Sequence, residues 1–120
     1  MQYVLLIYQG TTPLPTDPES WATLSEAEHQ AIYKDYAALG RTPGVTPGLP
    51  LGLPADAITV RVEDGKAVTS DGPYVGMKEA VGGYVVIEAD DEEKAIELAA
   101  RIPAARLGGA IEVRPVATYW

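Results

Sequence analysis

The segment QYVLLIY, residues 2–8, constrains the fold of this chain more than any other, because it is apolar on both of its alternating faces. In an extended strand one face would carry Tyr3, Leu5 and Ile7, and the other face would carry Val4, Leu6 and Tyr8. This pattern is typical of a strand in a sheet that is buried on both sides. We therefore expect structure to cover each face of the sheet that contains residues 2–8.

The first predicted helix follows a proline-rich loop at residues 11–18. Ser25 and Glu28 match a capping box, in which two side chains satisfy free backbone N–H groups at the start of a helix. Gly40 is suited to end this helix. Its inward face would carry His29, Ile32, Tyr36 and Leu39.

The second half of the chain predicts four strands and one helix. Residues 58–63 alternate between apolar and polar side chains, and Asp64-Gly65 is a strong hairpin signal before residues 66–70. Residues 84–89 and 110–116 are two further strands. Between them, Asp90 and Glu93 predict the start of a helix that Pro103 stops. The order of elements predicts a ferredoxin-like α+β sheet with two helices on one face and an inserted hairpin strand.

Two helices can cover only one face of such a sheet. Residues 2–8 and 84–87 are nevertheless apolar on both faces. A second copy of the chain, packed sheet to sheet about a two-fold axis, would cover the other face. We therefore expect a homodimer.

A tight turn and a glycine pair lie between two predicted strands, in the stretch of residues 69–89. Asp71 could accept hydrogen bonds from nearby backbone N–H groups, Gly72 permits a positive φ, and Pro73 ends strand pairing. The pair Gly82-Gly83 lets another backbone come close. The stretch is interpreted either as a turn alone or as a turn that also forms the rim of a pocket.

Residues 41–57, from Arg41 to Ala57, are rich in proline and glycine, and we expect them to be irregular. A loop of this length in a compact domain is either a lid or binding loop, or a tolerated insertion. Both interpretations stay open from the sequence.

The composition excludes several classes of function. A length of 120 residues fits one domain, residues 1–120, and a net charge of −8 argues against nucleic acid or an anionic membrane as a partner. Without cysteine there is no disulfide, thiol nucleophile or zinc-thiolate site. One histidine with scattered carboxylates predicts no metal, and the glycine pairs lack the context of a cofactor cradle. The opening residues lack a basic segment and a spanning apolar run, so a cytoplasmic location is expected.

Five segments carry a resemblance to a known family: YVLLIY, ITVR, VTSDGPYVGMKEAVGGYVVIEA, DDEEKAIELAARIP and IEVRPV. Together they resemble the YCII-related domain family in its DGPF branch, over nearly the whole chain. Tyr74 stands where the branch usually has phenylalanine, and Val75 and Gly76 are atypical. The resemblance implies a ferredoxin-like fold that dimerises through its sheets into an α+β barrel. The family's biochemical role is mostly unassigned, and DGPF members often accompany extracytoplasmic-type sigma factors.

Some relatives in the wider superfamily are similar to small lyases or dehydrochlorinases that use a histidine and an aspartate. The only histidine here, His29, would sit at a helix N-terminus, where the dipole favours a neutral imidazole that can accept a proton. Asp71 is the candidate partner, because it ends a strand near where the sheet should meet the helix. The relatives' aspartate falls where this chain has residues 100–103, which are Ala-Arg-Ile-Pro, so that aspartate is missing here. The alternative is a histidine that packs under the loop and hydrogen-bonds the backbone.

We predict that His29, Asp71 and Tyr74 share a cleft at the sheet edge, roofed by residues 41–54. The candidate ligand-binding residues are Tyr8, Tyr36, Arg61 and Tyr74. Arg61 has a structural alternative, which is pairing with Glu88 or Glu112 across the sheet.

Two functions follow from these patterns. The first is a dimeric domain that binds a small molecule and performs non-redox acid–base chemistry of the lyase or isomerase type, without a cofactor. The second is a non-catalytic interaction or regulatory module that acts through its dimer surface. The missing aspartate favours the second function, and the long loop near a lone histidine favours the first.

Overall fold

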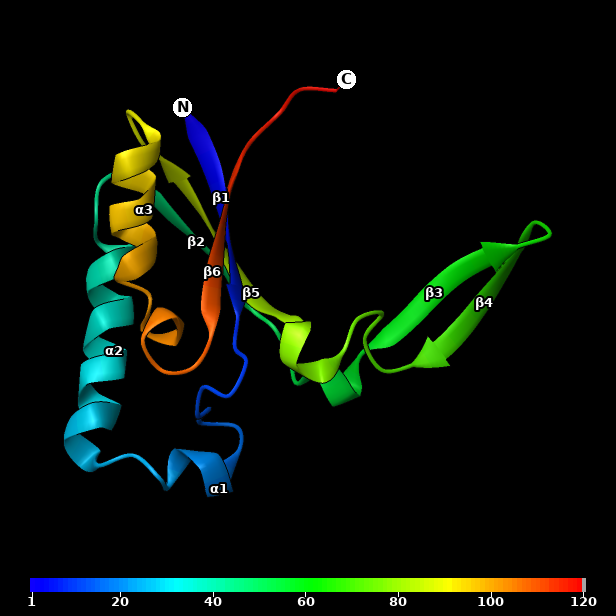
Figure 1. The fold of residues 1–120 in the computed structure, drawn as a ribbon, viewed down its shortest axis with the longest axis horizontal. Coiled ribbons are helices and arrows are strands. Elements are labelled where there is room, and N and C mark those ends of the chain that lie inside the picture. The colour runs from blue at the N-terminus through cyan, green and yellow to red at the C-terminus, as the bar shows by residue number, and fades with distance from the viewer. Residues whose placement is uncertain (120) are drawn as a thin grey trace.

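The structure is a computed structural model that describes residues 1–119, apart from the side chain of Lys78. Within these residues, one antiparallel sheet has the strand order β2-β5-β1-β6, and a separate antiparallel pair joins β3 to β4 (Figure 1). The strands are β1 (Gln2–Tyr8), β2 (Val45–Pro50), β3 (Ile58–Glu63), β4 (Lys66–Asp71), β5 (Val81–Glu88) and β6 (Ala110–Pro115). The helices are α1 (Pro18–Trp21), α2 (Glu26–Gly40) and α3 (Glu92–Ala100), with short 3-10 turns at Pro54–Asp56, Met77–Glu79 and Pro103–Ala105.

The four-stranded sheet has the ferredoxin-like plan that the sequence predicted. Its elements follow one another as β1, α2, β2, β5, α3 and β6, and both long helices lie on the same face of the sheet (Figure 1). The core lies between this face and the helices. Its members are apolar side chains from β1, β5, α2, α3 and the turn after α3, among them Leu5, Leu39, Ile87, Leu98 and Ile102.

Strand β2 corrects the prediction that residues 41–57 are irregular. Val45 pairs with Ile87, and Pro47 pairs with Val85, before the register shifts at Pro50. Because β2 is an edge strand, it needs ladder hydrogen bonds on one side only, and an edge strand tolerates proline. The second strand of the ferredoxin-like plan is therefore β2, and the predicted hairpin is an insertion outside the main sheet.

Both long helices begin at capping side chains. The Ser25 hydroxyl accepts a hydrogen bond of 3.2 Å from the Glu28 N–H, which confirms the predicted start of α2. The predicted cap of α3 is one residue too early, because Asp91 rather than Asp90 accepts from the Lys94 N–H at 2.9 Å. Neighbouring aspartates carry the same capping group, so the sequence pattern alone cannot choose between them.

The hairpin of β3 and β4 forms an arm that projects away from the main sheet (Figure 1). Asp64 and Gly65 have φ values of 51° and 74°, as the predicted tight hairpin turn requires. At the base of the arm, the Gly72 N–H donates to the Ala57 carbonyl at 2.7 Å, and the Thr59 hydroxyl donates to the Gly72 carbonyl at 2.8 Å. Gly72 has the predicted positive φ, 93°.

The face of the main sheet opposite the helices, called the open face below, carries the second set of apolar strand residues. Val4 pairs with Val86, and Leu6 pairs with Tyr84, so these four side chains point to the same side. They are half-buried or exposed, unlike their neighbours on the helix side. Among the described residues, no helix has the length and apolar character needed to cross a membrane.

Candidate functional site

A pocket of about 700 Å³, called the main pocket below, lies between α2, the main sheet and the proline-rich residues of β2 and its following loop. Ile7, Gly83 and Val85 line it from the sheet, and Tyr36 and Leu39 line it from α2. Residues 47–55 form its roof, and residues 14–16 close another side. Residues 47–54 of the predicted roof line it, but His29, Asp71 and Tyr74, which were predicted to share a cleft, do not.

Glycines explain why a hollow exists at this point of the sheet. At Gly83 strand β5 has no side chain, so the sheet leaves space below the roof, whereas the Gln9 side chain covers the neighbouring Gly82. A Cβ on Gly83 would have only ordinary contacts, the nearest being the Leu49 carbonyl oxygen at 3.7 Å. The register shift between Pro47 and Pro50 interrupts pairing with β5, as irregularities in strands do when they redirect the chain. The chain after β2 then continues as the roof.

The lining of the main pocket is mostly apolar. Among the described side chains it contains no charged group, and its polar side chains are Gln9, Thr16, Tyr36 and Tyr84. Burial raises the pKa of the Tyr36 phenol above its ordinary value, although nearby Arg106 acts in the opposite direction. The hydroxyl of Tyr36 therefore stays protonated at neutral pH and can donate a hydrogen bond.

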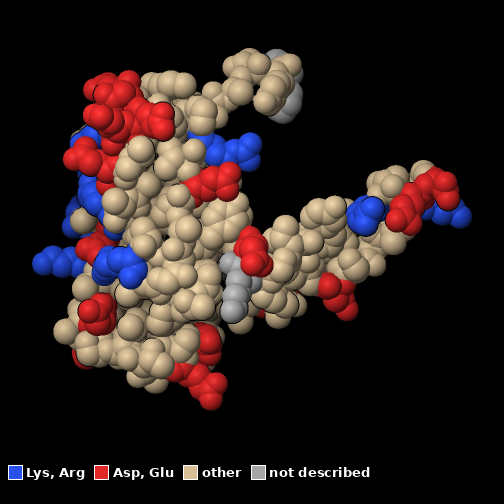
Figure 2. Space-filling view, in the orientation of Figure 1, with Lys and Arg blue, Asp and Glu red and all other residues tan. Residues whose placement is uncertain are grey.

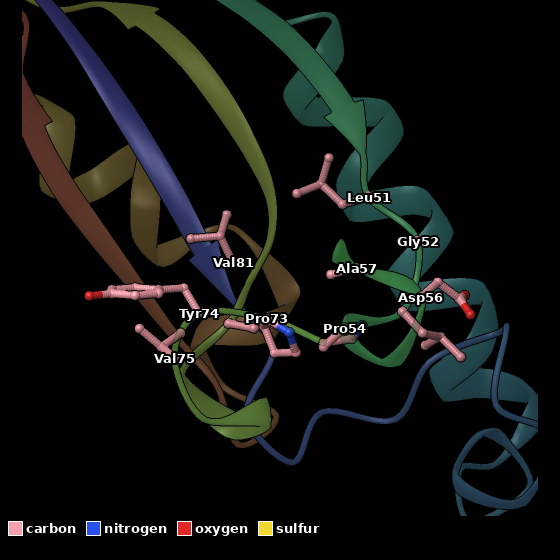
Figure 3. A pocket seen from close by; sticks show the side chains of 11 residues that line it. Leu51, Gly52, Pro54, Asp56, Ala57, Pro73, Tyr74, Val75 and Val81 are labelled. Carbon is pink, nitrogen blue, oxygen red and sulfur yellow. The ribbon is translucent and has the colours of Figure 1, made fainter. Parts of the chain in front are cut away.

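A second pocket, of about 310 Å³, lies beside the first at the base of the arm (Figure 3). Both pockets are lined by residues 51–54, so the same loop separates them. Tyr74 contributes to the second pocket, but it is 76% exposed and its hydroxyl points away from Pro54 and Ala57 (Figure 3). Asp56 is its charged lining residue among the described side chains.

His29 is held by residues close to it in the chain. Its Nε2 lies 2.7 Å from the carbonyl oxygen of Trp21, which can only accept, so Nε2 carries a proton and donates. The imidazole stacks on the Trp21 ring at 4.2 Å with an angle of 4°, and Nδ1 lies 3.4 Å from the Glu26 carboxylate. The side chain is only 15% exposed. His29 therefore fastens α1 to the start of α2, as in the backbone-bonded alternative.

Asp71 does not make the turn contacts expected of it. It ends β4 as an exposed residue, and its carboxylate has no hydrogen bond within the described part of the chain. The backbone of Gly72 and the hydroxyl of Thr59 hold the turn instead. Within one chain, His29 at the start of α2 and Asp71 in the arm lie in separate regions (Figure 1). A role for either residue in catalysis stays a prediction.

The two remaining ligand-binding candidates lie outside the main pocket. Arg61 is exposed on the arm opposite Val68, so its expected pairing with Glu88 or Glu112 does not form, because the arm is a separate sheet. Tyr8 lies on the main sheet and donates to the Glu112 carboxylate at 2.9 Å. This bond raises the pKa of Tyr8, with desolvation and the charge of Glu112 adding to it.

Sequence reasoning missed Gln9 and Thr16 as lining residues. Gln9 directly follows β1, where a ferredoxin-like strand leads toward the pocket, and this position was the available signal. Thr16 lies in a proline-rich loop whose path depends on tertiary contacts, and nothing in its local sequence marks it. Among the described residues, no group of three or more histidine or acidic side chains could hold a metal ion.

The sheet order, the two helices on one face and the apolar pocket beneath α2 define a small ferredoxin-like α+β domain with a ligand-sized hollow. The chain belongs to the YCII-related domain family, whose family model matches residues 1–119. A search of curated proteins found no match. Membership of the DGPF branch stays a prediction.

Proposed function

We propose that this YCII-related domain binds a small molecule in the main pocket. The observation that carries the proposal is the pocket itself, since about 700 Å³ falls within the range of small-molecule sites. An apolar lining with a few polar side chains is the usual composition of such sites. The roof of residues 47–55 joins β2 to the arm, so it would form a cover over the ligand.

We propose binding without acid–base catalysis as the activity of the single chain. Neither His29 nor Asp71 lines the main pocket, and both ring nitrogens of His29 face groups of its own helix region. Lyase or isomerase chemistry needs a base within hydrogen-bond reach of the substrate. Such chemistry would therefore require a side chain from a second copy.

A homodimer formed through the open face is the second part of the proposal. Val4, Leu6, Tyr84 and Val86 leave an apolar surface on this face, and soluble monomers rarely leave large apolar patches uncovered. The arm extends on the same side as the open face, and Figure 2 shows a hollow between the arm and the sheet. A second copy that packs on the open face would therefore also meet the arm.

The arm supports the alternative function of an interaction module. Ile58, Val60 and Val62 share one face of β3 and are exposed in the single chain. A two-stranded hairpin is marginally stable in water by itself, so these residues favour contact with another surface. In this alternative the dimer surface, rather than the pocket, would carry the biological role.

Two measurements test the proposed function. A thermal-shift screen of small molecules should give compounds that raise the melting temperature of the wild type, because binding to the native state stabilises it. The same compounds should have little effect on Gly83→Val, whose side chain would occupy the floor of the pocket. Light scattering at micromolar concentration should give twice the monomer mass for the wild type, and the monomer mass for Leu6→Asp. If no compound raises the melting temperature of the wild type more than that of Gly83→Val, binding in the pocket is contradicted. If the wild type has the monomer mass, the dimer is contradicted.

A further inference from the structure

We infer that the ligand of the main pocket is an uncharged molecule with an apolar or aromatic body and a carbonyl or hydroxyl group that bonds Tyr36 or Gln9. This inference rests on the proposed function, since it specifies what the same pocket binds. It is carried by the charges, the hydrogen bonds and the shape of the described lining.

The charge pattern of the lining is the first argument. No described side chain of the main pocket is charged, so an ionic ligand would lose its hydration without gaining a counter-charge. Arg106 affects Tyr36 electrostatically, but it does not line the main pocket, and it pairs with Asp35 at 3.0 Å. Its positive charge is therefore directed to Asp35 rather than to a carboxylate or phosphate in the pocket.

The polar side chains of the lining give the second argument. The Tyr36 hydroxyl and the Gln9 amide line the pocket, and neither makes a hydrogen bond with the described part of the chain. A ligand that displaces water from these groups must replace the lost hydrogen bonds, or its affinity falls. The phenol can donate to a carbonyl or accept from a hydroxyl, and the amide can do both. A neutral polar group on the ligand matches them.

The arrangement of these groups gives the third argument. Tyr36 lies on the α2 wall, whereas Gln9 follows β1 and packs over Gly82, where a Cβ would meet its side chain. Thr16 and Tyr84 are the other polar side chains of the lining, and the rest is apolar, mostly aliphatic side chains, prolines and glycines. The polar groups are therefore few and separated by apolar surface, which suits a mostly apolar molecule with one or two polar atoms.

Matched fluorescent probes test this inference. Prodan is a neutral naphthalene ketone, N-phenyl-1-naphthylamine is neutral without a carbonyl, and 1-anilinonaphthalene-8-sulfonate adds a sulfonate to the same aromatic system. Binding would be titrated in about 0.5 M salt, where the net charge of −8 is screened over a few ångströms. We expect both neutral probes to bind at least about tenfold more tightly than the sulfonate, because the sulfonate would lose its hydration without gaining a counter-charge.

Two tyrosine variants on α2 distinguish the loss of the Tyr36 hydrogen bond to the probe from a general effect of replacing tyrosine by phenylalanine. Tyr36→Phe should weaken prodan about three- to tenfold, as expected for one lost hydrogen bond, and should leave N-phenyl-1-naphthylamine unchanged. Tyr33→Phe is the matched control, because Tyr33 is exposed on the same helix and packs near Trp21 outside the pocket. Equal effects of the two variants on prodan would contradict the role of Tyr36.

Two further variants assign the probe signal to the pocket. Gly83→Val should remove binding of both neutral probes. Leu49→Lys, at an exposed lining position, should keep the protein folded, weaken prodan and strengthen the sulfonate. If the sulfonate binds the wild type as tightly as prodan and both signals are lost in Gly83→Val, the inference on ligand charge is wrong, while the proposed function stands. If no probe responds to Gly83→Val or to Leu49→Lys, the proposed function itself is wrong.

Discussion

Two glycines on neighbouring strands, both lining the main pocket, should respond to alanine in opposite directions. Gly48 lies on β2 and Gly83 on β5, and neither has the positive φ that would make alanine strained. A Cβ on Gly83 would lie 3.7 Å from the Leu49 carbonyl oxygen and 3.8 Å from Ile7 Cδ1, both ordinary contacts. Gly83→Ala should therefore stabilise the fold by about 0.5–1.5 kcal/mol, through lower entropy of the unfolded chain and one more buried carbon.

Gly48 has no such space. A Cβ there would lie near the Tyr84 carbonyl oxygen and 2.5 Å from an atom of the Tyr84 ring. The carbonyl belongs to β5 and cannot move without disturbing its strand, so β2 would be displaced from the sheet. Overpacking of this kind typically costs about 1–3 kcal/mol, and we expect Gly48→Ala to lower the free energy of unfolding by that amount.

Urea denaturation followed by circular dichroism measures both effects. The two variants should differ by about 1.5–4.5 kcal/mol in the free energy of unfolding, which separates their midpoints by roughly 1 M urea or more. Gly52→Ala is the control, because a Cβ there would approach only the Asp56 carboxylate, at 4.0 Å. Midpoints of Gly48→Ala and Gly83→Ala that shift in the same direction would refute the packing of β2 on β5 described above.

Three further predictions concern other parts of the fold. Gly72→Val should destabilise the base of the arm by about 1–3 kcal/mol, because Gly72 has a φ of 93°, whereas Asp71→Ala should cost less than about 0.5 kcal/mol. Amide hydrogen exchange in β3 and β4 should therefore be faster in Gly72→Val and unchanged in Asp71→Ala. The raised pKa of Tyr8 means that its bond to Glu112 is present below the ordinary value of 10.0 and is lost as pH rises through the folded-state pKa. Wild-type stability should therefore fall more than that of Tyr8→Phe as pH rises above 10.0, and parallel urea midpoints would contradict this. Leu5→Ala should lower the free energy of unfolding by about 2–5 kcal/mol in thermal or urea denaturation, since Leu5 is fully buried in the core. A loss under about 1 kcal/mol, as for a surface substitution, would be inconsistent with this burial.

Local signals predicted one central strand, one helix start and one hairpin turn. The two-sided apolar pattern of residues 2–8, the capping pair Ser25 and Glu28, and the Asp64-Gly65 turn each depend on neighbouring residues alone, and each is present as predicted. Strand β2 was not predicted, because proline lacks an N–H and Pro47 and Pro50 therefore disfavour a strand in the local sequence pattern. Its place at the sheet edge, which makes proline tolerable, is a property of the whole fold.

Of the candidate site residues proposed from the sequence, Tyr36 lines the main pocket. The inward face of α2 placed it beside a Pro/Gly segment. The contact of His29 with Trp21 depends on the short helix α1, which no periodic pattern of apolar residues predicted. Asp71 and Arg61 were expected near the sheet, but they lie on an arm whose separation from the sheet is set by its connections at both ends.

The most direct test of a ligand in the main pocket is a set of intermolecular nuclear Overhauser effects between bound prodan and methyl-labelled protein. We expect contacts from the naphthalene protons to methyl groups of Val45, Leu39 and Leu49, which line the pocket. Leu6 and Val4 on the open face serve as the internal comparison, because they lie on the opposite side of the sheet. Contacts confined to Val4 and Leu6 would contradict the account, since the probe would then bind the proposed dimer surface instead of the pocket.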